Sequence, residues 1–432
     1  MATGSNGERG GLFQQLSGRL GAGGSMAGAL RYPAYRKFFF GQLASVSGYN
    51  VLWLAQSWLV YDLTGSKLAL GYVGLATGVP AIVFNLVGGV LADRLDQRRL
   101  ITFTQGSSAL LLAILATLTA LDVVELWHIL VIAFCHGTLS SLEQPARQSI
   151  FPHLLDRKEL VTAVALNSAI WQGTRVVAPA IGGLIIAGLG TAFALYLVAG
   201  GFLFMAFTMA TLHVPPIPRT QGKVMDNMKE GLKFIAGSSV FSFLIAMTFF
   251  NSFFGMSYAQ LMPVFAEDEL GVGATGMGFL LTSSGIGAFL GIFIASGLGS
   301  FFQRGSLLIS GATLFGGFLA MFALSQWYPV SLLALFLVGM TNSIYMISIQ
   351  TSLQTMVPDA LRGRVMGVYG MTWSIMPLGA MQAGVVASFL GAPFAVALGG
   401  IAVAGFAVGI ASTNVRIRNL GAPAKEPAVA AG

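Results

Sequence analysis

Charged side chains are scarce in this sequence. Asp, Glu, Lys and Arg make up 9% of its 432 residues, whereas soluble proteins average about 25%. So few charges could not cover the surface of a soluble protein of this length. The hydrophobic fraction of 55% instead places most of the exterior in lipid, which excludes a soluble enzyme and a disordered protein.

Cysteine and histidine are also rare. The single Cys135 cannot form an internal disulfide bond. The four His are too dispersed for a convincing metal site. The chain contains no Gly-x-x-x-x-Gly-Lys-Ser/Thr run, so ATP is not expected to drive it. We expect no metal, no cofactor and no enzymatic activity.

Long apolar runs dominate what is present. A helix needs about 20 apolar residues to cross a bilayer, and the runs are too long and continuous for the alternating strands of a membrane barrel. The expected fold class is an all-α membrane protein with twelve transmembrane helices. They are predicted at about 37–61, 68–92, 100–121, 126–146, 162–187, 192–212, 240–265, 273–300, 306–326, 330–356, 365–389 and 393–413.

Basic residues gather in alternate connections. If the N-terminus is cytoplasmic, all of the 23 Lys and Arg except Lys67 and Arg175 fall in cytoplasmic segments. The external loops carry Asp122, Glu125 and the acidic run 267–269. The positive-inside rule then predicts a multi-pass inner-membrane (plasma-membrane) protein with both termini in the cytoplasm. The positive charge faces anionic lipid, so no nucleic-acid partner is expected.

The sequence repeats itself at an offset of 206 positions. Asp62 and Gly65 match Asp268 and Gly271, and Gln97-Arg98 matches Gln303-Arg304. An even number of helices in each copy predicts two parallel six-helix bundles, as in two-bundle transporters. The expected units are a flexible cytoplasmic tail at 1–34, bundles at 35–213 and 237–414, a cytoplasmic linker at 214–236 and a cytoplasmic tail at 415–432.

Several loop motifs carry a family resemblance. The segment 89–99, with Gly89, Asp93-Arg94 and Arg98-Arg99, resembles the loop signature of the major facilitator superfamily. Segments 58–66, 145–148 and 357–365 resemble the branch that contains enterobactin exporters and macrolide efflux proteins. The resemblance implies a monomeric secondary transporter that exposes one central site alternately to each side of the membrane. We expect it to export a small amphiphilic organic molecule, siderophore- or drug-like, in exchange for protons.

The resemblance also implies a cytoplasmic gate. In the family, the Asp of this motif docks against the start of span 11, where unpaired N–H groups leave a partial positive charge. The gating residues expected here are Asp93, Arg94, Arg98, Arg99, Arg362 and Arg364. Ala178-Pro179-Ala180-Ile181-Gly182-Gly183 resembles the Gly-Pro-x-x-Gly-Gly motif of proton-coupled exporters. Pro179, Gly182 and Gly183 could equally form a kinked, closely packed helix.

Charged residues within the spans are candidates for proton coupling. Glu143 precedes Arg147 by one helical turn, the favourable order for an ion pair. The pair could carry a proton or act as a fixed structural clamp. His136 is either a packing residue or a proton relay. Arg175 is expected to face the bundle interior, with Glu143 or Asp62 as its carboxylate partner.

Polar and aromatic residues share helical faces in spans 1, 7, 10 and 11. In the superfamily, spans 1, 4, 7 and 10 line the central cavity. The cavity residues expected here are Gln42, Tyr49, Gln56, Asn251, Tyr258, Tyr345 and Trp373. Amides, hydroxyls, rings and Met suit amphiphilic or aromatic molecules; about half of these residues could instead join helices by hydrogen bonds. An importer or facilitator of a small metabolite and a lipid flippase of the same fold remain alternatives.

Overall fold

The structure, a computed structural model, describes residues 26–212, 224–298, 303–418 and 420. Side chains are described for these residues except 26–27, 85–94, 224–227, 298 and 415–416. The described residues fold almost entirely into helices and contain no strand. The predicted all-helical membrane fold is confirmed.

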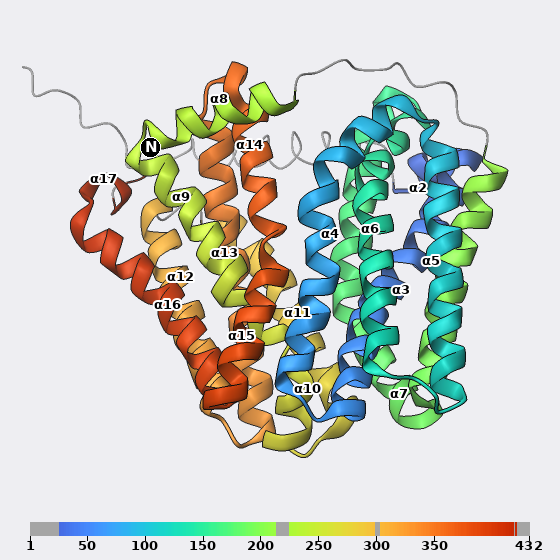
Figure 1. Cartoon of the computed structure of the whole chain (residues 1–432). Helices are drawn as coiled ribbons and strands as arrows, with labels where there is room; N and C mark the ends of the chain where they lie inside the picture. The colour runs from blue at the N-terminus through green and yellow to red at the C-terminus, as the bar shows by residue number, and fades with distance from the viewer. Residues whose placement is uncertain (1–25, 213–223, 299–302, 419, 421–432) are drawn as a thin grey trace, which may run out of the picture.

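The helices form two groups that stand side by side (Figure 1). The first group contains α2 (Met26–Leu30), α3 (Pro33–Thr64), α4 (Lys67–Arg94), α5 (Gln97–Ala120), α6 (Leu126–Ile150), η1 (Phe151–His153), η2 (Arg157–Glu159) and α7 (Leu160–Thr211). The second contains α8 (Val224–Ala236), α9 (Ser239–Phe250), η3 (Asn251–Gly255), η4 (Met256–Ala259), α10 (Met262–Val264), η5 (Phe265–Glu269), α11 (Gly273–Leu298), α12 (Arg304–Leu324), α13 (Tyr328–Met356), α14 (Asp359–Trp373), α15 (Met376–Leu390), α16 (Ala392–Thr413) and α17 (Val415–Arg418).

Ten helical stretches of the described residues are long and apolar enough to cross a membrane. One of them, the stretch that contains α7, has non-helical backbone at Gly190 and consists of two helices. The 32 residues of α3 are not among the ten, although they extend for about 48 Å at 1.5 Å per residue. The number of spans therefore stays a prediction.

Two of the predicted spans contain irregular turns. The span predicted at 240–265 lies within the helical stretch Ser239–Glu269. In it, α9 ends at Phe250 and is followed by π-helical, 3₁₀ and short α-helical turns. The segment 365–389 is divided between α14 and α15. Pro263 and Pro377 lie at the starts of α10 and α15. Because proline has no backbone N–H, neither residue can donate a helical hydrogen bond to the preceding turn.

Matching glycines support the internal repeat. Gly65 and Gly271, at the offset of 206 positions, have φ angles of 57° and 60°. Gly190 and Gly391, between the last two spans of each copy, have φ angles of 86° and 90°. Residues with a side chain rarely adopt this conformation, so glycine is favoured at these turns. The two copies therefore share backbone geometry at two equivalent connections.

The two groups of helices meet along two seams, α4 with α15 and α7 with α11. In the first seam, a Cβ added to Gly78 would lie 2.1 Å from Cβ of Pro377. In the second, a Cβ added to Gly278 would lie 2.5 Å from the carbonyl oxygen of Pro179. Both distances are too short for real contacts. The backbones approach this closely because the residues at the seams are small.

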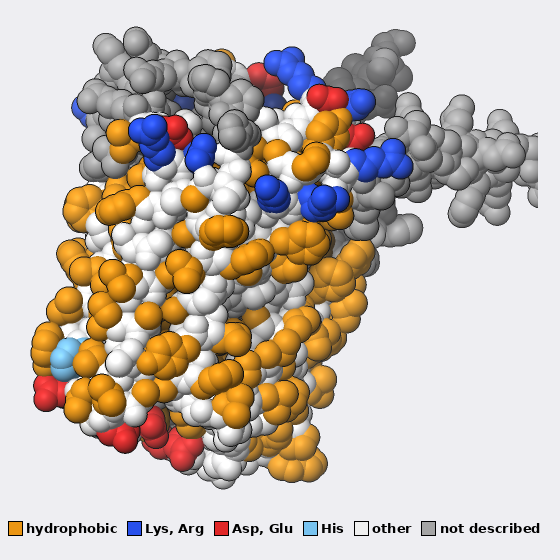
Figure 2. All heavy atoms as spheres, turned by 90° about the vertical axis from the view of Figure 1, so that its right-hand side faces the viewer, with side chains coloured by type: hydrophobic (Ala, Val, Ile, Leu, Met, Phe, Trp, Pro, Cys, Tyr) orange, Lys and Arg blue, Asp and Glu red, His pale blue; other side chains and the backbone are white. Residues whose placement is uncertain are grey.

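Charge is segregated to the two ends of the molecule. Figure 2 shows Lys and Arg gathered at one end, together with some Asp and Glu, and Asp and Glu at the other end, with a broad hydrophobic band between them. We call the first the basic end; it includes α8 and the start of α14. The acidic end includes the exposed Asp122, Glu125 and Asp268. This distribution is the one that the sequence predicted for cytoplasmic and external surfaces.

Candidate transport pathway and gating residues

A cavity of about 950 Å³ lies between the two groups of helices. Its wall comes from α3, α4 and α6 on one side and from α14 and α15 on the other. It extends from Met228 and Arg364 at the basic end to Met256 and Gln260. The wall contains three of the predicted cavity residues, Tyr49, Gln56 and Trp373. A site of this size can hold a drug-sized organic molecule.

Three other predicted cavity residues lie in hydrogen-bonded contacts inside the second group of helices. Tyr345 donates its hydroxyl hydrogen to Oδ1 of Asn251, which also accepts from Nδ2 of Asn342 at 2.9 Å. The hydroxyl groups of Tyr258 and Ser284 are 3.1 Å apart. Asn251, Tyr258 and Tyr345 are fully or almost fully buried. They join helices to each other, as the alternative interpretation of the sequence proposed.

Gln42 lies beside a second cavity of about 360 Å³, close to the basic end of α3 and α6. Arg147 and Trp171 also line it. Gln144 and Gln148 line both cavities. The two spaces are therefore separated by one face of α6.

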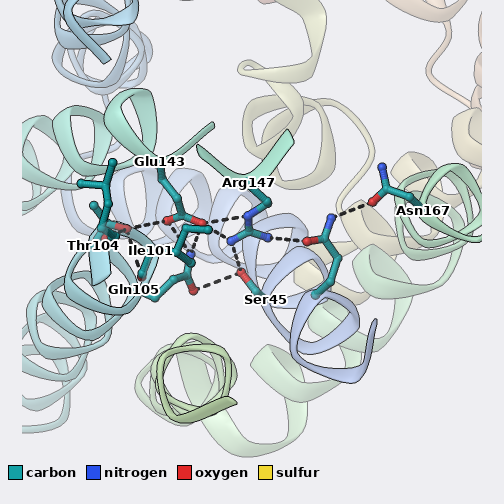
Figure 3. A network of polar contacts seen from close by, with 9 residues as sticks. Ser45, Ile101, Thr104, Gln105, Glu143, Arg147 and Asn167 are labelled. Atoms are coloured by element: carbon teal, nitrogen blue, oxygen red, sulfur yellow. Dashed lines mark hydrogen bonds and ion pairs between the residues drawn. The ribbon is translucent and has the colours of Figure 1, made fainter. Parts of the chain in front are cut away.

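Glu143 and Arg147 form a buried ion pair on α6 (Figure 3). The Glu143 carboxylate accepts from Nε of Arg147 at 2.8 Å and from the Thr104 hydroxyl at 3.1 Å. The amide of Gln105 donates to both carboxylate oxygens, at 2.9 and 2.8 Å. Both charged side chains are more than 90% buried. The carboxylate is thus fully supplied with donors, which a buried charge requires.

Arg147 extends this network to α3 and α7. Its guanidinium donates to Oε1 of Gln42 and to the Ser45 hydroxyl, each at 3.2 Å. Gln42 in turn donates to Oδ1 of Asn167 at 2.8 Å. One ion pair therefore connects α3, α5, α6 and α7 (Figure 3). Its geometry agrees with the structural clamp that was one of the two predicted roles.

The remaining candidates for proton coupling are scattered. His136 lines the large cavity and packs against Phe202, with ring centroids 5.6 Å apart. Asp62 is exposed near the outer end of α3. The prediction that Arg175 faces the bundle interior is wrong, since its side chain is exposed. Periodicity could not place Arg175, because the interior of the bundle and its outer surface both follow the helical repeat.

The predicted gating residues can be followed only in part. The side chains of Asp93 and Arg94 lie outside the described residues. Arg98 donates to the carbonyl oxygens of Met209 and Ala210, at 3.1 and 2.5 Å. Arg99 lies 3.8 Å from the carboxylate of Asp96, in a pair that is largely exposed. These two arginines contact their own group of helices.

Arg362 and Arg364 contact residues of the second group. Arg362 pairs with Asp359 at 2.5 Å, and Arg364 pairs with Glu230 of α8 at 2.5 Å. The helix α8 packs against α14, with Gly231 close to the carbonyl oxygen of Arg364. The basic residues around the start of α14 are therefore bound by local carboxylates in this conformation.

A family model described as a transmembrane secretion effector matches residues 24–430. The chain belongs to this family of the major facilitator superfamily. Its members and relatives are transporters and not enzymes. The chain is therefore a major facilitator secondary transporter and a multi-pass protein of the inner membrane.

Curated relatives and solved structures agree with this family. The chain is 27% identical over 341 residues to the enterobactin exporter EntS of Shigella flexneri, covering 78% of this chain and 81% of the relative. It is 28% identical to EntS of Shigella boydii serotype 18, with the same coverage of both chains.

The solved structures show the same fold. A bacterial homologue of the human lysosomal transporter Spinster superposes with a TM-score of 0.74 at 13% identity, covering 90% of this chain and 98% of that one. A D-xylose–proton symporter superposes with a TM-score of 0.65 at 14% identity, covering 87% and 97%.

In this chain, the motif that contains Pro179, Gly182 and Gly183 lies at the seam between α7 and α11. A Cβ added to Gly183 would lie 2.5 Å from the carbonyl oxygen of Ala274 on α11. On the other side of α7, a Cβ added to Gly182 would lie 3.3 Å from Val51 of α3. Pro179, Gly182 and Gly183 are all buried. The motif therefore allows α7 to pack closely against both groups of helices.

Sequence analysis missed four polar residues of the pathway. Thr104 and Gln105 complete the network around Glu143, and Gln144 and Gln148 stand between the two cavities. The available signal was polarity within predicted spans, because Thr104 and Gln105 are uncharged polar residues in the apolar run 100–121. A buried amide in lipid requires a partner, and Glu143 was the carboxylate predicted within a span of that bundle.

Proposed function

We propose that the protein exports a small amphiphilic organic molecule, siderophore- or drug-like, across the inner membrane in exchange for protons. The observation that carries this proposal is the cavity of about 950 Å³ between the two groups of helices. Aromatic rings, Met side chains and amides form much of its wall, which suits a molecule with both apolar and polar surfaces. The relatives named as enterobactin exporters support the direction of transport and the siderophore class.

Transport would proceed by rocking of the two bundles, 35–213 and 237–414. The conformation described here has its cavity at the basic end, which we assign to the cytoplasm together with both termini. Closing that end would bring α4 against the start of α14. Asp93 would then dock against the exposed N–H groups at the start of α14. Arg94, Arg98, Arg99, Arg362 and Arg364 would add charge pairs around this contact.

Proton coupling would use the ion pair of Glu143 and Arg147. Arg147 lines the smaller cavity, so the buried pair lies beside a space that a proton carrier could occupy. A proton on Glu143 would remove the charge that holds Arg147, and the links to α3 and α7 would weaken. His136, on the wall of the large cavity, would relay protons toward this pair. The protein would act as a monomer, since one chain provides both walls of the cavity.

Everted inner-membrane vesicles provide the direct test. Vesicles with the chain are given enterobactin, the compound named for the relatives, and an imposed inside-acid pH gradient. Accumulation inside the vesicles is expected, and collapse of the gradient with nigericin should abolish it. Accumulation that is insensitive to nigericin would contradict proton coupling. Transport only in right-side-out vesicles would contradict export.

A further inference from the structure

The cavity wall, as far as it is described, contains basic side chains and no carboxylate. Among the described wall residues they include Arg364 and His136, a guanidinium and an imidazole, alongside Tyr49. Neither Arg364 nor His136 can offset a positive charge on a bound molecule. Arg364 is itself paired with Glu230, 2.5 Å away, so the net charge that this end of the cavity presents is small.

Most polar groups on the wall are uncharged. Within the described part of the chain, the side-chain amides of Gln56, Gln144 and Gln148 make no hydrogen bond. Gln144 and Gln148 are exposed to the space that they line. Each amide offers both a donor and an acceptor, so these three residues can bind hydroxyl, carbonyl or carboxylate groups without a charged partner.

Two tryptophans face the cavity from opposite bundles. Trp53 belongs to α3 and Trp373 belongs to α14. Their rings can stack on flat, aromatic molecules. The attraction of a ring face for a cation is about 0.5–1 kcal/mol at an exposed site. An organic cation that entered this cavity would lose part of its hydration and gain no carboxylate from the described wall.

We propose that the cavity binds polar aromatic molecules that are uncharged or acidic, and that it excludes organic cations. This inference rests on the proposed export function and narrows the class of its substrate. The wall offers uncharged amides where a cation-binding site would have carboxylates. It can therefore form hydrogen bonds with neutral or acidic molecules, but it cannot neutralise a positive charge.

The test measures binding to the purified full-length chain with three probes that share one ring system. These are 1-pyrenebutanol, 1-pyrenebutyrate and a pyrenebutyl trimethylammonium salt, followed by energy transfer from tryptophan to pyrene. The alcohol and the carboxylate are expected to bind at least ten-fold more tightly than the ammonium. Substitution Gln56→Glu should strengthen ammonium binding at least ten-fold and weaken carboxylate binding. Ser140→Asp, also on the wall, should act in the same direction if Gln56→Glu fails to fold.

The matched control is Gln303→Glu, which adds the same charge at an exposed position before α12. It should leave all three affinities unchanged. Equal affinities for the three probes, or no binding of any of them, would overturn the proposal, as would an unchanged preference in both Gln56→Glu and Ser140→Asp. Binding is measured without a gradient, so a failure of proton-coupled export in vesicles would leave these results unaffected and the two failures can be told apart.

Discussion

The hydroxyl of Tyr61 donates to Oδ2 of Asp268 at 2.5 Å and connects the two groups of helices at the acidic end. Tyr61 ends the buried part of α3, whereas Asp268 lies on η5 and is exposed. A second hydrogen bond between the two groups involves nearby residues of the sequence: Nε2 of Gln260 donates to the carbonyl oxygen of Leu70 at 3.2 Å. The acidic end is therefore held closed by side chains as well as by the two seams of small residues.

Loss of the Tyr61 hydroxyl should favour opening of the acidic end. Tyr61→Phe removes one hydrogen bond to a carboxylate, and because Asp268 is exposed we expect an effect of about 0.5–1.5 kcal/mol. The measurement is labelling of Gln56→Cys by a membrane-impermeant maleimide added outside cells, with Cys135 replaced by Ala. Tyr72→Phe, at an exposed tyrosine of α4, is the control. Equal labelling of the two variants would show that this hydrogen bond does not hold the end closed.

Gly183→Ala should also favour opening of the acidic end, because it disturbs the seam between α7 and α11. The added Cβ would lie 2.5 Å from the carbonyl oxygen of Ala274, and such overpacking costs about 1–3 kcal/mol. We expect faster external labelling of the same cysteine. Gly188→Ala on the same helix meets nothing within 4 Å and should label like the parent. A parent-like rate for Gly183→Ala would mean that the seam does not limit opening.

Arg147→Met should lower the free energy of unfolding by about 3–5 kcal/mol, because it leaves the buried Glu143 carboxylate without its cation. The double variant Glu143→Gln/Arg147→Met should recover much of this loss, since no unpaired charge remains. Thermal unfolding in detergent measures both. Arg99→Met breaks a largely exposed pair with Asp96 and should change stability by less than about 1 kcal/mol.

The same double variant separates a clamp from a proton carrier. If Glu143 carries the proton, the stable double variant should lose gradient-driven accumulation in everted vesicles and retain downhill movement of the substrate. Parent-like accumulation in that variant would assign the pair a structural role alone.

The pH dependence of Tyr32 can be predicted at the basic end. A hydrogen bond to Asp156, at 2.7 Å, raises the pKa of the Tyr32 hydroxyl above 10.0, with smaller contributions from desolvation and charge. The pKa of Tyr32 is therefore higher in the folded state than in the unfolded state. The contact contributes its full stability below the pKa of the unfolded state, and this stability is lost as the pH rises through the pKa of the folded state. Asp156→Asn should lower the pKa of Tyr32 in an absorbance titration, with Tyr32→Phe identifying its signal. An identical titration in Asp156→Asn would contradict this assignment.

The breaks between spans show which structural features the local sequence can predict. The predicted gap at 188–191 coincides with Gly190, which has a φ of 86°, because apolar runs and glycine are local signals. The span predicted at 240–265 lies within the helical stretch Ser239–Glu269. Hydrophobicity alone does not reveal that the backbone hydrogen-bond pattern of this stretch changes at Asn251. The ion pair of Glu143 and Arg147 was predicted from its spacing on one helix. Its hydrogen bonds to Gln105 and Ser45 involve other helices, so the spacing of residues along one helix could not predict them.

The sequence by itself determined that this protein lies in a membrane, that it is helical, that its charges separate to two ends and that it consists of two copies of one unit. These properties follow from composition and from periodicity along the chain. Only the tertiary structure decided which polar faces line the cavity, as with Gln56, and which join neighbouring helices, as with Asn251. Both faces have the same helical period, and the choice depends on which helix packs against each of them.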